Sequence, residues 1–207
     1  MADLTAFLEP ALYLLHVGGI AVFAVSGALA AARRRLDVVS AFFFAVITAI
    51  GGGTLRDLLI DAPVFWIHDA TALVVCLSVT LAVWLVPLRA WPSRAIEWFD
   101  AAGLAAFAVY GASKALGVGI SPLPAVVAGV VTACVGGILR DVVANVPSIM
   151  LRNELYVTAA ILAAGVFVLL EVAGFGTEFA ALTGALAGFA LRGAAIRWGL
   201  AVPTHRG

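Results

Sequence analysis

The chain has 207 residues, of which 64% are hydrophobic and only 12% charged, and its formal net charge is zero. Soluble domains usually contain about 45–50% apolar and about 25% charged residues. The composition therefore excludes an ordinary water-soluble protein and indicates one transmembrane domain over residues 1–207. The zero net charge also removes the electrostatic basis for a nucleic-acid partner, so none is expected.

Seven apolar segments follow one another, each close to the ~20 residues that a helix needs to cross a bilayer. They cover residues 11–32, 38–60, 69–88, 98–115, 122–145, 153–172 and 178–196. No basic stretch precedes the first segment and no cleavage site follows it, so a retained span is expected and not a signal peptide. The fourth and seventh segments are the shortest, so six spans is the alternative to an all-α membrane protein with seven transmembrane helices.

Arginine collects in every second connection between these segments. The arginines concerned are Arg33, Arg34, Arg35, Arg89, Arg94, Arg152, Arg192, Arg197 and Arg206. Basic loops tend to stay on the cytoplasmic side of a membrane. The N-terminus is therefore predicted to lie outside and the C-terminus in the cytoplasm, which agrees with an odd number of spans.

The sequence repeats itself after 84 residues. The shift places "FAVSGA" (23–28) on "FAVYGA" (107–112), and "TAIGGGTLRDLLIDAP" (48–63) on "TACVGGILRDVVANVP" (132–147). Apolar helices often resemble one another by chance, but a shared GG-x-L-R-D-x5-P pattern is far more specific. Each copy holds three spans, so residues 10–90 and 94–174 are predicted to form two inverted three-helix repeats, with a seventh helix over 178–196.

Five glycines of the repeated motif lie inside predicted helices, where glycine costs ~0.5–1 kcal/mol relative to alanine. They are Gly51, Gly52, Gly53, Gly136 and Gly137. The functional interpretation is that they break the second and fifth helices and act as pore hinges, because irregular backbone in a membrane must line protein or a water-filled cavity. The alternative is close helix packing at small residues. Matched copies in inverted halves favour the pore.

The motif also carries Arg56 with Asp57, and Arg140 with Asp141. Charges inside a membrane cost ~2.5–3.5 kcal/mol and usually face protein or water. Adjacent residues on a helix point about a hundred degrees apart, so each charge is expected to find its partner on a neighbouring element and not in its sequence neighbour. The alternative is that both pairs reach out to the two membrane interfaces as helix-end anchors.

Several other polar residues lie in the predicted spans. The candidates for lining a pore are Ser26, Thr48, Tyr110, Ser113, Lys114 and Thr132. Taken singly, each is better explained by a hydrogen bond within or between helices than by a role in a pore. His16 is interpreted as a buried histidine with its hydrogen bonds satisfied. Gly184 and Gly188 show GxxxG spacing and are interpreted as helix packing or an oligomer contact.

Enzyme motifs are missing. "GGGTLRD" lacks the G-K-[ST] ending of a phosphate-binding loop, and neither HExxH nor GxSxG occurs. Cys76 and Cys134 lie in apolar stretches and are interpreted as small buried hydrophobic residues. No catalytic residue, metal site or cofactor is therefore predicted.

At this level of detail the chain resembles the TRIC (trimeric intracellular cation) channels. Two three-span repeats, a seventh helix and the elements "GGGTLRD" and "VGGILRD" carry the resemblance over residues 10–196. It is most similar to the prokaryotic relatives, which are also described as a glycine-transporter family. The resemblance implies a homotrimer with one pore in each subunit, second and fifth helices kinked at glycines, and passage of potassium and sodium ions.

The resemblance does not extend to every property of the animal members. Their Lys-Glu-Val motif, associated with phosphoinositide binding, is absent, since the first motif runs on as "RDLLID". The expected location is a prokaryotic plasma membrane and not the endoplasmic reticulum. The expected ligands are the permeant potassium or sodium ions, with membrane lipid around the protein and a bound phospholipid left open.

The predicted mechanism is cation flow between the second and fifth helices. Glycine carbonyls and the hydroxyls of Thr48, Thr132, Ser26 and Tyr110 would partly replace hydration. Asp57 and Asp141 would offset Arg56 and Arg140 at the mouths, and Lys114 would gate one of them. Two alternatives remain: a secondary transporter of a small amino acid such as glycine, and a membrane scaffold without transport.

Overall fold

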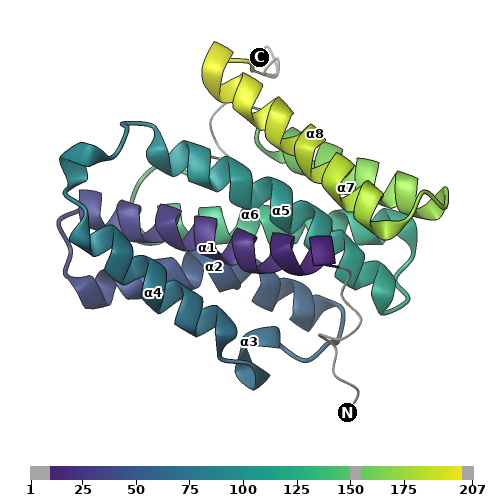
Figure 1. The fold of residues 1–207 in the computed structure, drawn as a ribbon, viewed down its shortest axis with the longest axis horizontal. Coiled ribbons are helices and arrows are strands. Elements are labelled where there is room, and N and C mark those ends of the chain that lie inside the picture. The colour runs from purple at the N-terminus through teal and green to yellow at the C-terminus, as the bar shows by residue number, and fades with distance from the viewer. Residues whose placement is uncertain (1–9, 150–154, 202–207) are drawn as a thin grey trace, which may run out of the picture.

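The fold is all-helical in the part of the chain that the computed structural model describes, residues 10–149 and 155–201. Figure 1 shows it along the chain. The helices are α1 (Pro10–Arg33), α2 (Val38–Leu59), α3 (Phe65–His68), α4 (Thr71–Leu85), the 3-10 turn η2 (Leu88–Ala90), α5 (Ala95–Gly117), α6 (Pro122–Val143), α7 (Val157–Val172) and α8 (Thr177–Trp198).

Each of the seven predicted segments coincides with a helix, namely α1, α2 and α4 to α8. Four of them (α1, α2, α6 and α8) are long and apolar enough to cross a membrane, whereas α4 and α7 are shorter apolar helices. The short elements α3 and η2 were not predicted, because a single helical turn has no hydrophobic period to detect. Residues 153–154 of the predicted sixth segment, with Arg152 and Arg206, lie outside the described residues.

The helices pack in two matching groups. α1 contacts α2 and α4, and α2 contacts α4; likewise α5 contacts α6 and α7, and α6 contacts α7. The groups meet through α1 against α5 and α2 against α6, and α8 packs mainly on α7 and α5. In Figure 1 the α7–α8 pair lies along one side of the remaining helices. Buried alanines and glycines fill α1 and α5, which permits the close approach that holds helices together in lipid.

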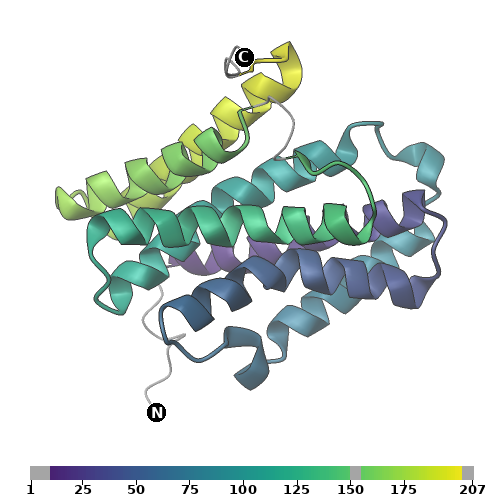
Figure 2. The same ribbon diagram turned by 180° about the vertical axis from the view of Figure 1, so that it is seen from behind.

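The α2 and α6 helices cross in an antiparallel manner, and Figure 2 shows them side by side. A Cβ atom on Gly52 would strike the carbonyl oxygen of Thr132, and one on Gly136 would strike that of Thr48. An earlier residue of α2 thus faces a later residue of α6, which fixes the antiparallel direction. The two backbones touch because both positions lack a side chain.

Both helices continue through their glycines. α2 is helical over Val38–Leu59 and α6 over Pro122–Val143, so the expectation of helices broken at residues 51–53 and 136–137 is wrong. The crossing supplies the reason: glycine is needed for contact with the opposite helix, and this contact is compatible with regular helical backbone.

Candidate functional site

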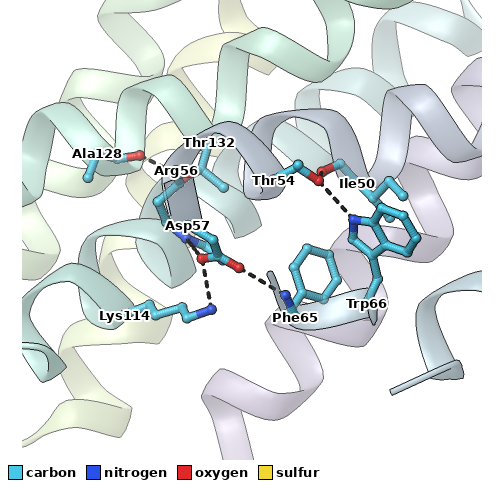
Figure 3. Close-up of polar contacts among 9 residues, drawn as sticks. All are labelled: Ile50, Thr54, Arg56, Asp57, Phe65, Trp66, Lys114, Ala128 and Thr132. Carbon is cyan, nitrogen blue, oxygen red and sulfur yellow. Dashed lines mark hydrogen bonds and ion pairs between the residues drawn. The ribbon is translucent and has the colours of Figure 1, made fainter. Parts of the chain in front are cut away.

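The first polar cluster lies one helical turn beyond the crossing, near the end of α2, and is shown in Figure 3. Arg56 donates from Nε and Nη2 to Oδ1 of Asp57, at 2.9 and 2.7 Å. The expectation that adjacent residues would not pair is therefore wrong. The long arginine side chain bends back to its neighbour, although the two Cβ atoms point in different directions.

Asp57 also has partners on neighbouring elements, as predicted. Lys114 of α5 donates from Nζ to the same Oδ1 at 2.8 Å. The other oxygen, Oδ2, accepts the backbone N–H of Phe65 at 3.1 Å. A single carboxylate thus lies between two cations and at the same time holds the loop that follows α2.

Aromatic rings surround this cluster. The guanidinium of Arg56 lies 5.3 Å from the centre of the Tyr110 ring, and Lys114 Nζ lies 6.0 Å from that of Phe65. His16 of α1 stacks on Tyr110 at 4.3 Å and meets Phe65 edge-on at 5.2 Å. Its Nδ1 is buried without a hydrogen-bond partner among the described residues. The interpretation of His16 as a satisfied histidine is therefore wrong.

The second polar cluster repeats this arrangement at the end of α6. Arg140 donates from Nε to Oδ1 of Asp141 at 2.9 Å, and from Nη1 to Oδ1 of Asp100 at 2.6 Å. The same Nη1 donates to the hydroxyl of Ser26 on α1. Oδ2 of Asp141 accepts the backbone N–H of Ile149 at 2.8 Å. Both motif aspartates therefore hold the loop eight residues further on.

These bonds explain the spacing of the repeated motif. Asp57 and Phe65, like Asp141 and Ile149, are joined across a tight turn that contains the motif proline. At the matching positions Asp61 and Asn145, φ is 52° and 50°, a left-handed conformation that aspartate and asparagine tolerate better than most residues. The pattern R-D-x5-P thus marks the end of a helix whose aspartate accepts a hydrogen bond from the loop that follows.

Burial contradicts the interpretation of the charges as interfacial anchors. Arg56 and Arg140 are each 1% exposed, Asp57 is 0% and Asp141 is 4% exposed. Charged side chains of this kind inside a membrane protein face its interior. The two pairs are therefore internal parts of the fold.

The remaining predicted residues lie around the crossing. Gly51 and Gly53 leave room for Leu139 and for the Phe65 ring, and Gly137 leaves room for Tyr156 and Asp100. The hydroxyls of Thr48 and Thr132 donate to carbonyls one turn back in their own helices, each at 2.6 Å. The threonines thus follow the alternative of local hydrogen bonding.

Two buried charges were missed. Asp100 of α5 is 0% exposed and binds Arg140. Arg192 was assigned to a cytoplasmic end of the chain, but it is 0% exposed within α8 and lies 5.2 Å from the centre of the Tyr156 ring. The repeat gave a signal for the first of them, because the 84-residue shift places His16 on Asp100.

Within residues 10–149 and 155–201, no group of three or more His, Cys, Asp or Glu side chains is placed so that it could hold a metal ion. Cys76 and Cys134 are both free and buried, as predicted. The arrangement is thus a pair of buried ionic clusters at opposite ends of an antiparallel helix crossing.

The relatives of the chain are membrane proteins. A family model described as "Glycine transporter" matches residues 13–87 and 97–172. A UPF0126 membrane protein of Vibrio cholerae is 43% identical over 206 residues, which is 97% of this chain and 85% of that protein. The UPF0126 inner membrane protein YadS of Escherichia coli is 42% identical over 199 residues, covering 93% of this chain and 95% of that protein.

Solved structures agree with this assignment. The TRIC trimeric intracellular cation channel orthologue from Rhodobacter sphaeroides is 38% identical, with a TM-score of 0.86 over 93% of this chain and 100% of that chain. A prokaryotic TRIC channel crystallised in 0.5 M KCl is 28% identical, with a TM-score of 0.82 over 92% of this chain and 98% of that chain. The chain is a membrane protein of the glycine transporter family and a prokaryotic member of the TRIC channel family.

Proposed function

We propose that this protein is a channel for monovalent cations, potassium and sodium, with a pore formed around α2 and α6. The observation that carries the proposal is the pair of buried ionic clusters at either end of the glycine crossing. Ionisable groups inside a membrane mark ion pathways more often than structural positions. The likeness to solved TRIC cation channels supports the same reading.

The proposed architecture is two inverted three-helix repeats, residues 10–90 and 94–174, with the seventh helix over 178–196. The two ranges matched by the family model start at residues 13 and 97, which reproduces the 84-residue shift. Contacts support the inversion: Gly19 of α1 faces Phe107 of α5, and Gly103 of α5 faces Phe23 of α1. This crossing is antiparallel and reciprocal, as is that of α2 and α6.

In the proposed mechanism, Lys114 blocks one end of the path. Its Nζ lies 2.8 Å from Oδ1 of Asp57, where the carboxylate would otherwise attract a permeant cation. Lys114 is 13% exposed as a side chain, whereas Asp57 is fully buried, so the lysine is the partner that can move. Displacing it would expose the carboxylate of Asp57, which Arg56 continues to bind.

The pore-lining and hinge roles are proposals for the residues that were predicted from the motif. Gly51, Gly52, Gly53, Gly136 and Gly137 would permit a change in the crossing, and Ser26, Thr48, Thr132 and Tyr110 would flank the ions. The protein is proposed to form a homotrimer in the cell membrane among phospholipids. The first cluster would face outside, as the arginine distribution predicts.

A carrier for a small amino acid is the second candidate. The description of the family favours it, and so does the close placement of buried cations and a carboxylate at Arg56, Lys114 and Asp57. Such a set has groups of both signs for a zwitterion. Inverted repeats suit alternating access as well as an open pore.

Reconstitution into planar bilayers and liposomes decides between the two. Unitary potassium currents that reverse at the Nernst potential are expected for the channel. Saturable glycine exchange without unitary currents would establish the carrier instead. Lys114→Met is expected to raise the open fraction of the channel, because methionine fills similar space without a charge. An unchanged open fraction would contradict the proposed block.

A further inference from the structure

The two clusters contain matched arginines but different charges around them. The 84-residue shift places His16 on Asp100 and Ala30 on Lys114. Both differences make the first cluster more positive than the second. Where the second cluster has a carboxylate the first has an imidazole, and where the first has an ammonium group the matching position is an alanine.

The described contacts give the charge of each cluster. In the first, Arg56 and Lys114 share the single carboxylate of Asp57, which leaves one positive charge in excess. In the second, Arg140 is bound by both Asp100 and Asp141. Arg192 lies 5.2 Å from the centre of the Tyr156 ring, and the Tyr156 hydroxyl and Asp100 Oδ1 both lie against Gly137. Two cations and two carboxylates therefore belong to the second cluster, which is balanced.

His16 is the residue that occupies the position of the missing carboxylate. It lies against Tyr110 and Phe65, and the charges within its reach are Arg56, Lys114, Asp57 and the exposed Asp69. An imidazole is neutral or positive but never negative. His16 therefore leaves the excess charge of the first cluster uncompensated in either protonation state.

We infer that His16 makes the first cluster an electropositive barrier, and that cations pass more easily when they enter at the second cluster. This inference rests on the proposed channel function. A buried charge is screened much less than one in water. One unit charge at roughly 10 Å, with an effective dielectric constant of about 20, changes a local ion concentration by about tenfold. The proposed channel thus passes cations more easily in one direction, because Lys114 adds a positive charge to the first cluster and His16 supplies no carboxylate to offset it.

The test uses two variants that remove the same charge in different ways. Lys114→Met removes a positive charge from the first cluster, and His16→Asp adds a negative one. Wild-type channels in symmetric potassium chloride are expected to pass about tenfold less current for cations entering at the first cluster. Both variants are expected to bring the two directions close to equality. His16→Glu places the same charge if His16→Asp does not assemble.

His68→Asp is the matched control. It makes the same substitution at an exposed residue of α3, where water and salt screen the charge, so rectification is expected to persist. Rectification that survives in both the His16 and Lys114 variants would overturn the inference, as would its loss in His68→Asp. If only Lys114→Met equalises the currents, the charge of the lysine alone forms the barrier and the role of His16 is refuted. A wild type that conducts equally in both directions refutes the barrier alone, whereas one without unitary currents refutes the channel as well.

Discussion

A methyl group on Gly136 is expected to disrupt the contact between α2 and α6. The Cβ atom would lie far inside van der Waals distance of the Thr48 carbonyl oxygen, and carbon atoms pack best at ~3.5–4.0 Å. The obstacle is backbone of a regular helix, which no side-chain rotation can remove. Gly136→Ala therefore forces the helices apart or shifts one along the other.

The expected cost is that of overpacking, about 1–3 kcal/mol, less the ~0.5–1 kcal/mol that alanine gains over glycine in a helix. Gly18 and Gly165 are helical glycines with open space around their Cβ positions, so they provide matched controls. Gly18→Ala and Gly165→Ala are expected to show only the helix stabilisation of alanine over glycine, without the cost of overpacking. Thermal unfolding of the purified protein in detergent is expected to place Gly136→Ala below the wild type and both controls above it.

The twin position sharpens the experiment. Gly52 faces Thr132 as Gly136 faces Thr48, so Gly52→Ala is expected to cost a similar amount. Once one methyl group has separated the helices, a second costs less, and the double variant is expected to be more stable than additivity predicts. Equal stability of Gly136→Ala and the two controls would refute the crossing as described. Strict additivity would refute the coupling between its two contacts.

Two further results are expected. Asp57→Asn leaves Arg56 and Lys114 without their shared carboxylate, a loss of about 3–5 kcal/mol, and adding Lys114→Met should recover part of it; detergent melting curves that show no loss contradict the buried pairing. The hydrogen bond from the Ser40 N–H lowers the pKa of Asp37 at the start of α2. The stabilisation that the ionised Asp37 carboxylate gives to the folded protein is complete above the aspartate pKa of the unfolded chain. It is lost as pH falls through the lower pKa that Asp37 has in the folded protein. The melting difference between wild type and Asp37→Asn should vanish there, and a pH-independent difference contradicts the cap.

The helices and the motif were predictable from sequence. Lipid requires long apolar segments, so hydropathy located the seven major helices to within a few residues. The repeat was visible because the R-D-x5-P pattern spans few residues. In both copies its aspartate, Asp57 or Asp141, accepts a hydrogen bond from the backbone eight residues later. Hydropathy and the repeated motif each depend on residues close together in the chain, so both can be recognised in one sequence.

The partners of the charges were less predictable. Cβ directions suggested that Arg56 and Asp57 would diverge, but the length of the arginine side chain outweighs that direction. The burial of Arg192 depends on how α8 packs on the rest, which no spacing within α8 shows. The use of Gly52 as a contact point in a continuous helix shows only in the packing of α2 against α6. These features arise between elements distant in the chain.

Each motif carboxylate binds an arginine side chain and a backbone N–H group at the same time. This limits which substitutions either aspartate can tolerate. Oδ1 of Asp57 binds cations while Oδ2 holds the Phe65 backbone, so a substitution there damages the ion pair and the turn together. Residues around the motif differ between the two copies: the 84-residue shift places Ser26 on Tyr110 and His16 on Asp100. The two clusters can thus differ in charge through the neighbours of the motif, while both keep the same arginine and aspartate.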